Sequence, residues 1–274
     1  MIDYHLLILN TVGNIISCIS CLKVLLFPKH IRAYNLIMYV ILLCDFVSSL
    51  TDALSWFSYY PSICVIQVIG TQFFALSSFL LIGLIIWYIK KININDVDQY
   101  IVSAISGFDM NDFNQTIESE LKKKLSIRIG LCFAVSGTIT IIIFGFKMYG
   151  RLDDTWCWIT DDYKLFRILF YNGIIIAIWL YSIVNIVYII FKKQLAKWSN
   201  SWQSHLNMIK IYLVSCTIIF IVIKSPSILY RFLNYAGINL YWLLVISTIC
   251  NSLIGFVNAL LFEIYKNKIN PQSS

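Results

Sequence analysis

Seven long apolar stretches occupy most of this chain, and each is long enough to cross a bilayer as a helix. They run over about 6–27, 34–55, 66–89, 129–148, 168–191, 210–233 and 240–262. A hydrocarbon core of about 30 Å requires about 20 apolar residues in a helix. In lipid a helix satisfies every backbone polar group within its own segment. The pattern predicts an all-α membrane protein, a seven-transmembrane helix bundle that forms a single domain over residues 1–274.

The composition excludes a water-soluble fold. The chain is 59% hydrophobic and only 13% charged, whereas soluble domains carry roughly 25% charged residues. The formal net charge of +7 does not indicate nucleic-acid binding, because the basic residues are spread between the apolar stretches. The loops around 29–32, 90–91, 122–128 and 192–197 are the richer in Lys and Arg and should be cytoplasmic. The N-terminus is then outside, the C-terminus inside, and the plasma membrane is the expected location.

The segment 92–121 is polar and interrupts the apolar pattern in the second inner loop. Val97, Ile101, Ala104, Ile105 and Phe108 fall at helical spacing on one face. One interpretation is an amphipathic insertion that lies on the inner leaflet or contacts a partner. The other is a partly ordered loop. The sequon at Asn114 should stay unmodified on the inner side, so its glycosylation would contradict this topology.

Polar residues recur at helical spacing inside the apolar stretches, where they usually face the interior of a bundle. Asp45 and Asp52 lie two helical turns apart on one face, and similar faces carry Asn14 in the first stretch and Asn251 and Asn258 in the last. We expect a hydrated polar core joining Asn14, Asp45 and Asn258, with Asp52 and Asn251 beside it. The alternative for each residue is a static packing role through interhelical hydrogen bonds.

The sixth stretch carries two cations on either side of a proline. Pro226 frees a backbone carbonyl and predicts a bend or hinge between Lys224 and Arg231. Both cations point the same way in the outer half, so that with outer-loop cations they could surround an anionic ligand. The alternative is that they extend toward lipid headgroups. The candidate ligand-binding set is Arg151, Trp156, Trp158, Lys164, Arg167, Lys224 and Arg231.

Two of the eight cysteines differ from the rest in position. Six fall within apolar stretches and are expected to be small buried hydrophobes. Cys64 and Cys157 fall on the predicted outer side, where oxidation is permitted. A disulfide between them would connect the outer end of the third helix to the second outer loop.

Four short motifs stand out along the chain: Cys64-Val65-Ile66-Gln67, Trp156-Cys157-Trp158-Ile159, Pro226-Ser227 with Arg231, and Gly255-Phe256-Val257-Asn258. Together they resemble the motifs of one receptor family, the cyclic-AMP receptor and receptor-like family of seven-transmembrane G-protein-coupled receptors. Trp156-Cys157-Trp158-Ile159 is similar to that family's W-C-W-I, and Cys64-Val65-Ile66-Gln67 to the start of its third helix. Pro226-Ser227 with Arg231 resembles its sixth-helix motif, and Gly255-Phe256-Val257-Asn258 its seventh-helix G-F-x-N. The motifs occur in the family's order along the chain.

The resemblance implies a receptor that passes an outside chemical signal to a heterotrimeric G protein. It implies that Cys64 and Cys157 form the bridge, that Trp156 and Trp158 pack the outer loop, and that Pro226, Arg231 and Asn258 act in a switch or pocket. Two departures bear on coupling and ligand: the insertion at 92–121, and Lys224-Ser225 where the family has a tryptophan near the proline. A divergent receptor that binds a ligand or partner without signalling is the alternative.

Other classes of membrane protein have less support. A transporter or channel would require an interrupted helix pair or a charged pathway, and the sequence indicates neither. A retinal protein would require a lysine in the last helix, and 240–262 contains none. His5, His30 and His205 lie at or beyond helix ends, and no nucleophile–base set is evident. We therefore expect no enzyme activity, no metal and no cofactor; the expected partners are the bilayer, a small-molecule ligand and a G protein.

Overall fold

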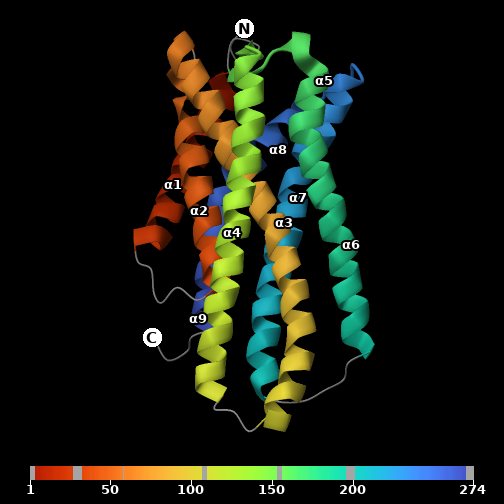
Figure 1. The fold of residues 1–274 in the computed structure, drawn as a ribbon. Helices are drawn as coiled ribbons and strands as arrows, with labels where there is room; N and C mark the ends of the chain where they lie inside the picture. Colours follow the sequence, from red (N-terminus) through yellow and green to blue (C-terminus); the bar gives the residue numbers. More distant parts are fainter. Residues whose placement is uncertain are drawn as a thin grey trace.

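The computed structural model is a bundle of long helices that run side by side along a common axis (Figure 1). It describes residues 4–26, 33–57, 59–106, 110–152, 156–195 and 201–269. Within these ranges, six helices are long and apolar enough to cross a membrane, and a bent pair of helices supplies a seventh span. The predicted all-α, multi-pass membrane architecture is confirmed.

The helices, strands and short turns are α1 (Tyr4–Leu26), α2 (Ala33–Ala53), η1 (Leu54–Phe57), α3 (Pro61–Ser106), α4 (Met110–Gly145), β1 (Tyr149–Leu152), β2 (Trp156–Ile159), η2 (Asp161–Tyr163), α5 (Lys164–Arg167), η3 (Ile168–Gly173), α6 (Ile174–Leu195), α7 (Ser201–Tyr235), α8 (Tyr241–Ser252) and α9 (Ile254–Ile269). α3 is central: it packs against α2, α4, α6, α7 and both strands.

The side chains are distributed as lipid requires, with polar groups inside and apolar groups outside. On α1 the buried face is formed by Asn10, Gly13, Asn14, Ser17, Cys21 and Val24. Its opposite face exposes Ile8, Val12, Ile15 and Ile19. In water such a helix would bury the reverse face, because apolar burial drives soluble folding. In a bilayer the outer face is solvated by lipid, and the interior packs through small and polar residues.

Three helices extend beyond the apolar stretches that the sequence marks. The membrane-spanning part of α3 is Pro61–Trp87, yet the helix continues to Ser106. At 1.5 Å per residue that continuation adds roughly 28 Å. α4 begins at Met110 and α7 at Ser201, both well before their apolar parts. Figure 1 shows α3 and α4 reaching farther than α9 at the end of the bundle opposite the hairpin.

The predicted insertion at 92–121 falls on this extension. The backbone is helical through Ser106 and again from Met110, so it continues α3 and begins α4. Its side chains lie outside the described part of the chain, so its contact with a membrane or partner stays a prediction.

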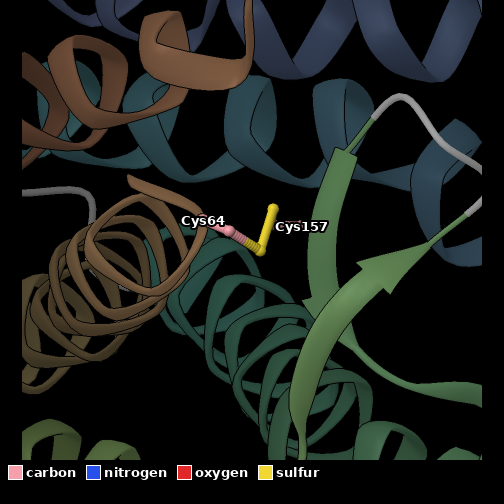
Figure 2. Close-up of a disulfide and its surroundings, with 2 residues drawn as sticks. All are labelled: Cys64 and Cys157. Carbon is pink, nitrogen blue, oxygen red and sulfur yellow. A yellow bond between two sulfur atoms is a disulfide. The ribbon is translucent and has the colours of Figure 1, made fainter. Parts of the chain in front are cut away.

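A short antiparallel hairpin covers the end of the bundle from which α3 begins. β1 pairs with β2 in the register Gly150 opposite Trp158 and Arg151 opposite Cys157. Cys157 is bonded to Cys64 at the start of α3, with the two Cα atoms 5.4 Å apart (Figure 2). The predicted disulfide is therefore confirmed. It fixes the hairpin to the helix that contacts most of the bundle.

The last membrane span is broken, whereas α7 runs unbroken through Pro226. α8 and α9 meet at Leu253 with a bend of 46°. Ser17 on α1 is inserted into the break: its hydroxyl donates to the Ser252 carbonyl (2.6 Å) and accepts from the Phe256 amide (3.1 Å). In a straight helix those two backbone groups would bond to each other. A side chain that enters the backbone ladder is a recognised cause of a sharp bend.

Candidate functional site

A polar cavity lies between the hairpin and the middle of the bundle. The volume open to the centres of water molecules in this cavity is about 60 Å³. A single water needs on the order of 10–15 Å³ by this measure, so several fit. The lining residues come from α1, α2, α3, β2, η3, α7, α8 and α9; they are Asn14, Asp45, Ser48, Ser49, Asp52, Thr71, Ala75, Phe79, Trp158, Tyr171, Lys224, Arg231, Asn251 and Ile254.

Asp45 is a buried carboxylate in the lining of the cavity. Its side chain is 3% exposed. Its two carboxylate oxygens accept from Ser78 on α3 (2.8 Å) and from Asn258 on α9 (2.7 Å). Gly255 lets α9 come this close, because a Cβ there would lie 3.5 Å from the Cβ of Asp45 and 3.1 Å from Ser17. Asp45 thus connects α2, α3 and α9.

Lys224 on α7 supplies the buried positive charge. Its ammonium donates to Asn251 Oδ1 on α8 at 2.7 Å and lies 4.6 Å from the centre of the Phe79 ring. Asp45 and Asp52 are both within electrostatic range of it. Asn14 Nδ2 donates a long hydrogen bond of 3.3 Å to Asp52. A buried ammonium in a bundle interior needs such carboxylates nearby, because an unpaired charge there is costly.

Arg231 lies two helical turns farther along α7, beside the hairpin. Its guanidinium donates to Asn172 Oδ1 at 3.1 Å. The guanidinium carbon is 4.6 Å from the centre of the Tyr171 ring and 5.5 Å from that of Trp158. The Trp158 and Tyr171 rings meet edge to face, 5.1 Å apart. Two aromatic walls and one amide therefore hold the guanidinium at this end of the cavity.

Trp158 carries a buried donor without an acceptor. The side chain is 5% exposed, and its indole Nε1 has no hydrogen-bond partner. Leaving a buried donor unpaired costs about 1–3 kcal/mol. Such groups are rare in folded proteins and call for an explanation. Nearby on β1, the Tyr149 hydroxyl is also unpaired, and burial raises the pKa of this phenol so that it stays neutral.

The formal charges of the cavity balance. Asp45 and Asp52 on α2 carry two negative charges, and Lys224 and Arg231 on α7 carry two positive charges. The carboxylates therefore form one wall and the cations another. A ligand that enters this space meets both signs of charge, and the donors at the Arg231 end favour an acceptor.

The structure brings together seven of the residues singled out from the sequence. Asn14, Asp45, Asp52, Trp158, Lys224, Arg231 and Asn251 line the cavity. Asn258 contacts it through Asp45, and Pro226 lies on α7 between the two cations. Arg151 and Trp156 are placed in the two strands, and Lys164 and Arg167 at the ends of α5. The side chains of these last four lie outside the described part of the chain, so their ligand contacts stay predictions.

Sequence reasoning missed the residues that hold Arg231. Tyr171 and Asn172 sit in η3, a π-helical segment within the fifth apolar stretch. π-helical turns inside helices occur frequently at functional sites. A lone asparagine beside a tyrosine in an apolar helix was the available signal. The hairpin was also missed, although the aromatic and β-branched residues of Trp156–Ile159 are typical of a strand.

The described residues hold no group of three His, Cys, Asp or Glu side chains that could bind a metal ion. The polar atoms of the cavity come instead from two carboxylates, an ammonium, a guanidinium, an indole, amides and hydroxyls. This arrangement can form hydrogen bonds and ion pairs with a small polar ligand.

No family model matches this chain. The chain is similar to cyclic AMP receptor-like protein A of Dictyostelium discoideum, with 24% identity over 230 residues. The alignment covers 82% of this chain and 54% of that protein, so the chain spans about half the length of the curated relative it matches. The resemblance that the local motifs indicate is thus confirmed over most of the chain: this is a multi-pass membrane protein that resembles the cyclic-AMP receptor-like proteins.

Proposed function

We propose that this chain is a receptor of the cyclic-AMP-receptor-like kind, which binds a small anionic ligand from outside and signals to a heterotrimeric G protein. The observation that carries the proposal is the polar cavity that links the disulfide-fixed hairpin to the buried charges of α2 and α7. The distant resemblance to a receptor-like protein supports the same class.

The cavity offers a route for a ligand to bias the bundle. Lys224 on α7 contacts α8 through Asn251, and Asp45 on α2 contacts α9 through Asn258. A ligand that changes either contact acts on one half of the broken span relative to the other. Differential affinity for two arrangements of the helices is what a receptor requires.

The membrane orientation is part of the proposal. We place the hairpin and the start of α1 outside, and the α3–α4 extension with residues 92–121 on the inner side, where it would contact the G protein. The excess of Lys and Arg in those loops supports this orientation. Glycosylation of Asn114 in cells, read from the mobility of the protein before and after glycosidase treatment, would contradict it.

The direct test is a G-protein activation assay in cells that express the chain on their surface. Cells are exposed separately to cyclic nucleotides, folates and other small anionic metabolites. A ligand-dependent signal, weakened by Arg231→Lys with surface expression retained, is the expected result. No signal from any ligand, with surface expression verified by labelling, would favour the receptor that binds without signalling.

An ion-coupled transporter is the second candidate, because the structure contains a feature that the sequence did not indicate. The break between α8 and α9 lies beside the buried charges, and interrupted helices form the substrate and ion sites of many transporters. Uptake of a labelled anion into vesicles reconstituted with the purified protein, without G-protein activation in cells, would favour this candidate.

A further inference from the structure

Trp158 and Arg231 come from separate parts of the chain and meet at the hairpin end of the cavity. Trp158 is on β2, which the disulfide holds against α3, and Arg231 is on α7. Tyr171 contacts both the indole and the guanidinium. Both side chains line the same cavity.

The two side chains offer hydrogen-bond donors and one positive charge. The indole Nε1 of Trp158 is buried and unpaired. A guanidinium presents five N–H donors in a planar fork that matches carboxylate and phosphate oxygens. One nitrogen of the Arg231 guanidinium donates to Oδ1 of the neighbouring Asn172. An unpaired donor beside a cation requires an acceptor, and the best acceptor is an oxyanion.

We infer that Trp158 Nε1 and the Arg231 guanidinium together bind the oxyanion of a small ligand, a carboxylate or a phosphate group. The cavity of about 60 Å³ has room for such a group. Nε1 has no exposed surface in the unliganded structure, so the indole turns toward the oxyanion when it binds. The bound oxyanion connects the hairpin to α7. The inference rests on the proposed role of the cavity in ligand binding, and it does not depend on coupling to a G protein.

A carboxylate in the same cavity should lower the affinity for an oxyanion, whereas the two donors raise it. Asp52 lines the same cavity, and its carboxylate is within electrostatic range of Tyr171, which contacts both proposed donors. Its repulsion weakens the binding of any anion there. Removal of this charge in Asp52→Asn should therefore strengthen oxyanion binding, whereas removal of a donor should weaken it.

The test uses the purified full chain in an uncharged detergent, with acetate, inorganic phosphate and cyclic AMP as separate probes. Acetamide is the neutral control for acetate, because it has nearly the same shape without the charge. Binding is read by calorimetric titration and by the ligand-dependent shift of the unfolding temperature. We expect phosphate or acetate to bind and acetamide not to bind; equal binding of acetate and acetamide would overturn the inference.

Trp158→Phe removes the indole N–H and keeps an aromatic ring. Its matched control is Trp179→Phe, because Trp179 Nε1 is also buried and unpaired, but Trp179 is not among the cavity-lining residues. Hydrogen bonds to charged groups contribute enough that Trp158→Phe should weaken oxyanion binding by roughly tenfold or more. Trp179→Phe should leave it unchanged. Equal affinities in the two variants would overturn the inference.

A variant that fails to fold would not leave the question open, because Arg231→Lys provides a second measurement. A lysine keeps the charge but loses the planar fork, so phosphate should bind more weakly than in the unmodified chain. Unchanged phosphate affinity in a folded Arg231→Lys protein would contradict the site. Folding of each variant is verified by the Cys64–Cys157 disulfide and by a single peak in size exclusion.

The oxyanion could be that of a soluble ligand or of a lipid headgroup, and competition distinguishes them. Displacement of bound phosphate by short-chain phosphatidic acid, but not by phosphatidylcholine of the same length, would assign the site to a headgroup. Displacement by cyclic AMP or acetate alone would assign it to a soluble ligand. Oxyanion binding without a signal in cells would support this site and contradict the proposed coupling to a G protein. A cellular signal that Trp158→Phe leaves unchanged would support the coupling and contradict this site.

Discussion

Ser17 on α1 donates a hydrogen bond of 2.6 Å to the backbone carbonyl of Ser252, at the point where the last membrane span breaks. The two residues are 235 positions apart in the chain. The same hydroxyl accepts from the Phe256 amide, so it takes the place of one backbone hydrogen bond of a continuous helix. α1 therefore helps to set the angle between α8 and α9.

Ser17→Ala should destabilise the bundle and alter the break. Without the hydroxyl, the Ser252 carbonyl and the Phe256 amide are left unpaired in a buried position, at a cost of about 1–3 kcal/mol. The unfolding temperature in detergent and the hydrogen-exchange rate of the Phe256 amide measure the effect. Ser182→Ala is the control, because Ser182 bonds only within its own helix, to the Ile178 carbonyl. Equal losses in the two variants would contradict the role of Ser17.

Two glycines should respond in opposite ways to the same substitution. A Cβ on Gly13 would clash with the Ser252 side chain, whereas a Cβ on Gly130 would meet nothing within 4 Å. Gly13→Ala should therefore cost about 1–3 kcal/mol through overpacking. Gly130→Ala should be neutral or stabilise by up to about 1 kcal/mol, because alanine is the better helix former. Unfolding temperatures of the two variants test the contrast; a stabilising Gly13→Ala would contradict the close contact of α1 with α8.

The seven spans were predictable because length and apolar content are strong local signals. The break at Leu253 was not, since neither a proline nor a glycine occupies it and its cause is a serine on another helix. The extensions of α3, α4 and α7 were missed for a different reason: their residues are polar, and hydropathy identifies only the part of a helix that lies in lipid. Pro226 predicts a bend or hinge in α7; the helix is continuous through Pro226, and the bend stays a prediction.

The site was predictable in its charges and not in their partners. Helical spacing placed Asp45 and Asp52 on an interior face, and Lys224 was a candidate ligand-binding cation; all three line the cavity. Spacing within one helix says nothing about which residue of another helix it meets. Asn172 holds Arg231 only because η3 and α7 lie together, and Ser78 reaches Asp45 only because α2 and α3 do.

Asn258→Leu should destabilise the protein more than the same change at Asn185. Asn258 donates to the buried Asp45 carboxylate from another helix, whereas Asn185 donates to the Tyr181 carbonyl of its own helix. Loss of a hydrogen bond to a charged group costs about 1.5–3 kcal/mol. Chemical unfolding of both variants in the same detergent measures the difference. A smaller loss for Asn258→Leu would show that Asp45 is satisfied without α9.

The disulfide should contribute to stability under oxidising conditions. Cys64 and Cys157 are 93 residues apart, and closing a loop of this size removes freedom from the unfolded chain. Cys64→Ala combined with Cys157→Ala should cost about 2–4 kcal/mol. A reductant should lower the unfolding temperature of the unmodified chain and leave that of the double variant unchanged. A similar effect of the reductant on both proteins would mean that another bond is responsible.

Lys224→Met should be the most destabilising of these changes, and a second substitution should partly reverse it. Lys224 lies within electrostatic range of Asp45 and Asp52, so its loss leaves buried carboxylates without their compensating charge. Removing one partner of a buried charge group costs about 3–5 kcal/mol. Asp52→Asn in the Lys224→Met background removes one of the uncompensated charges and should recover part of the loss. A double-mutant cycle over the two positions gives the coupling free energy, which we expect to exceed about 0.5 kcal/mol. Strictly additive effects would contradict an electrostatic connection between α7 and α2, because independent sites do not rescue each other.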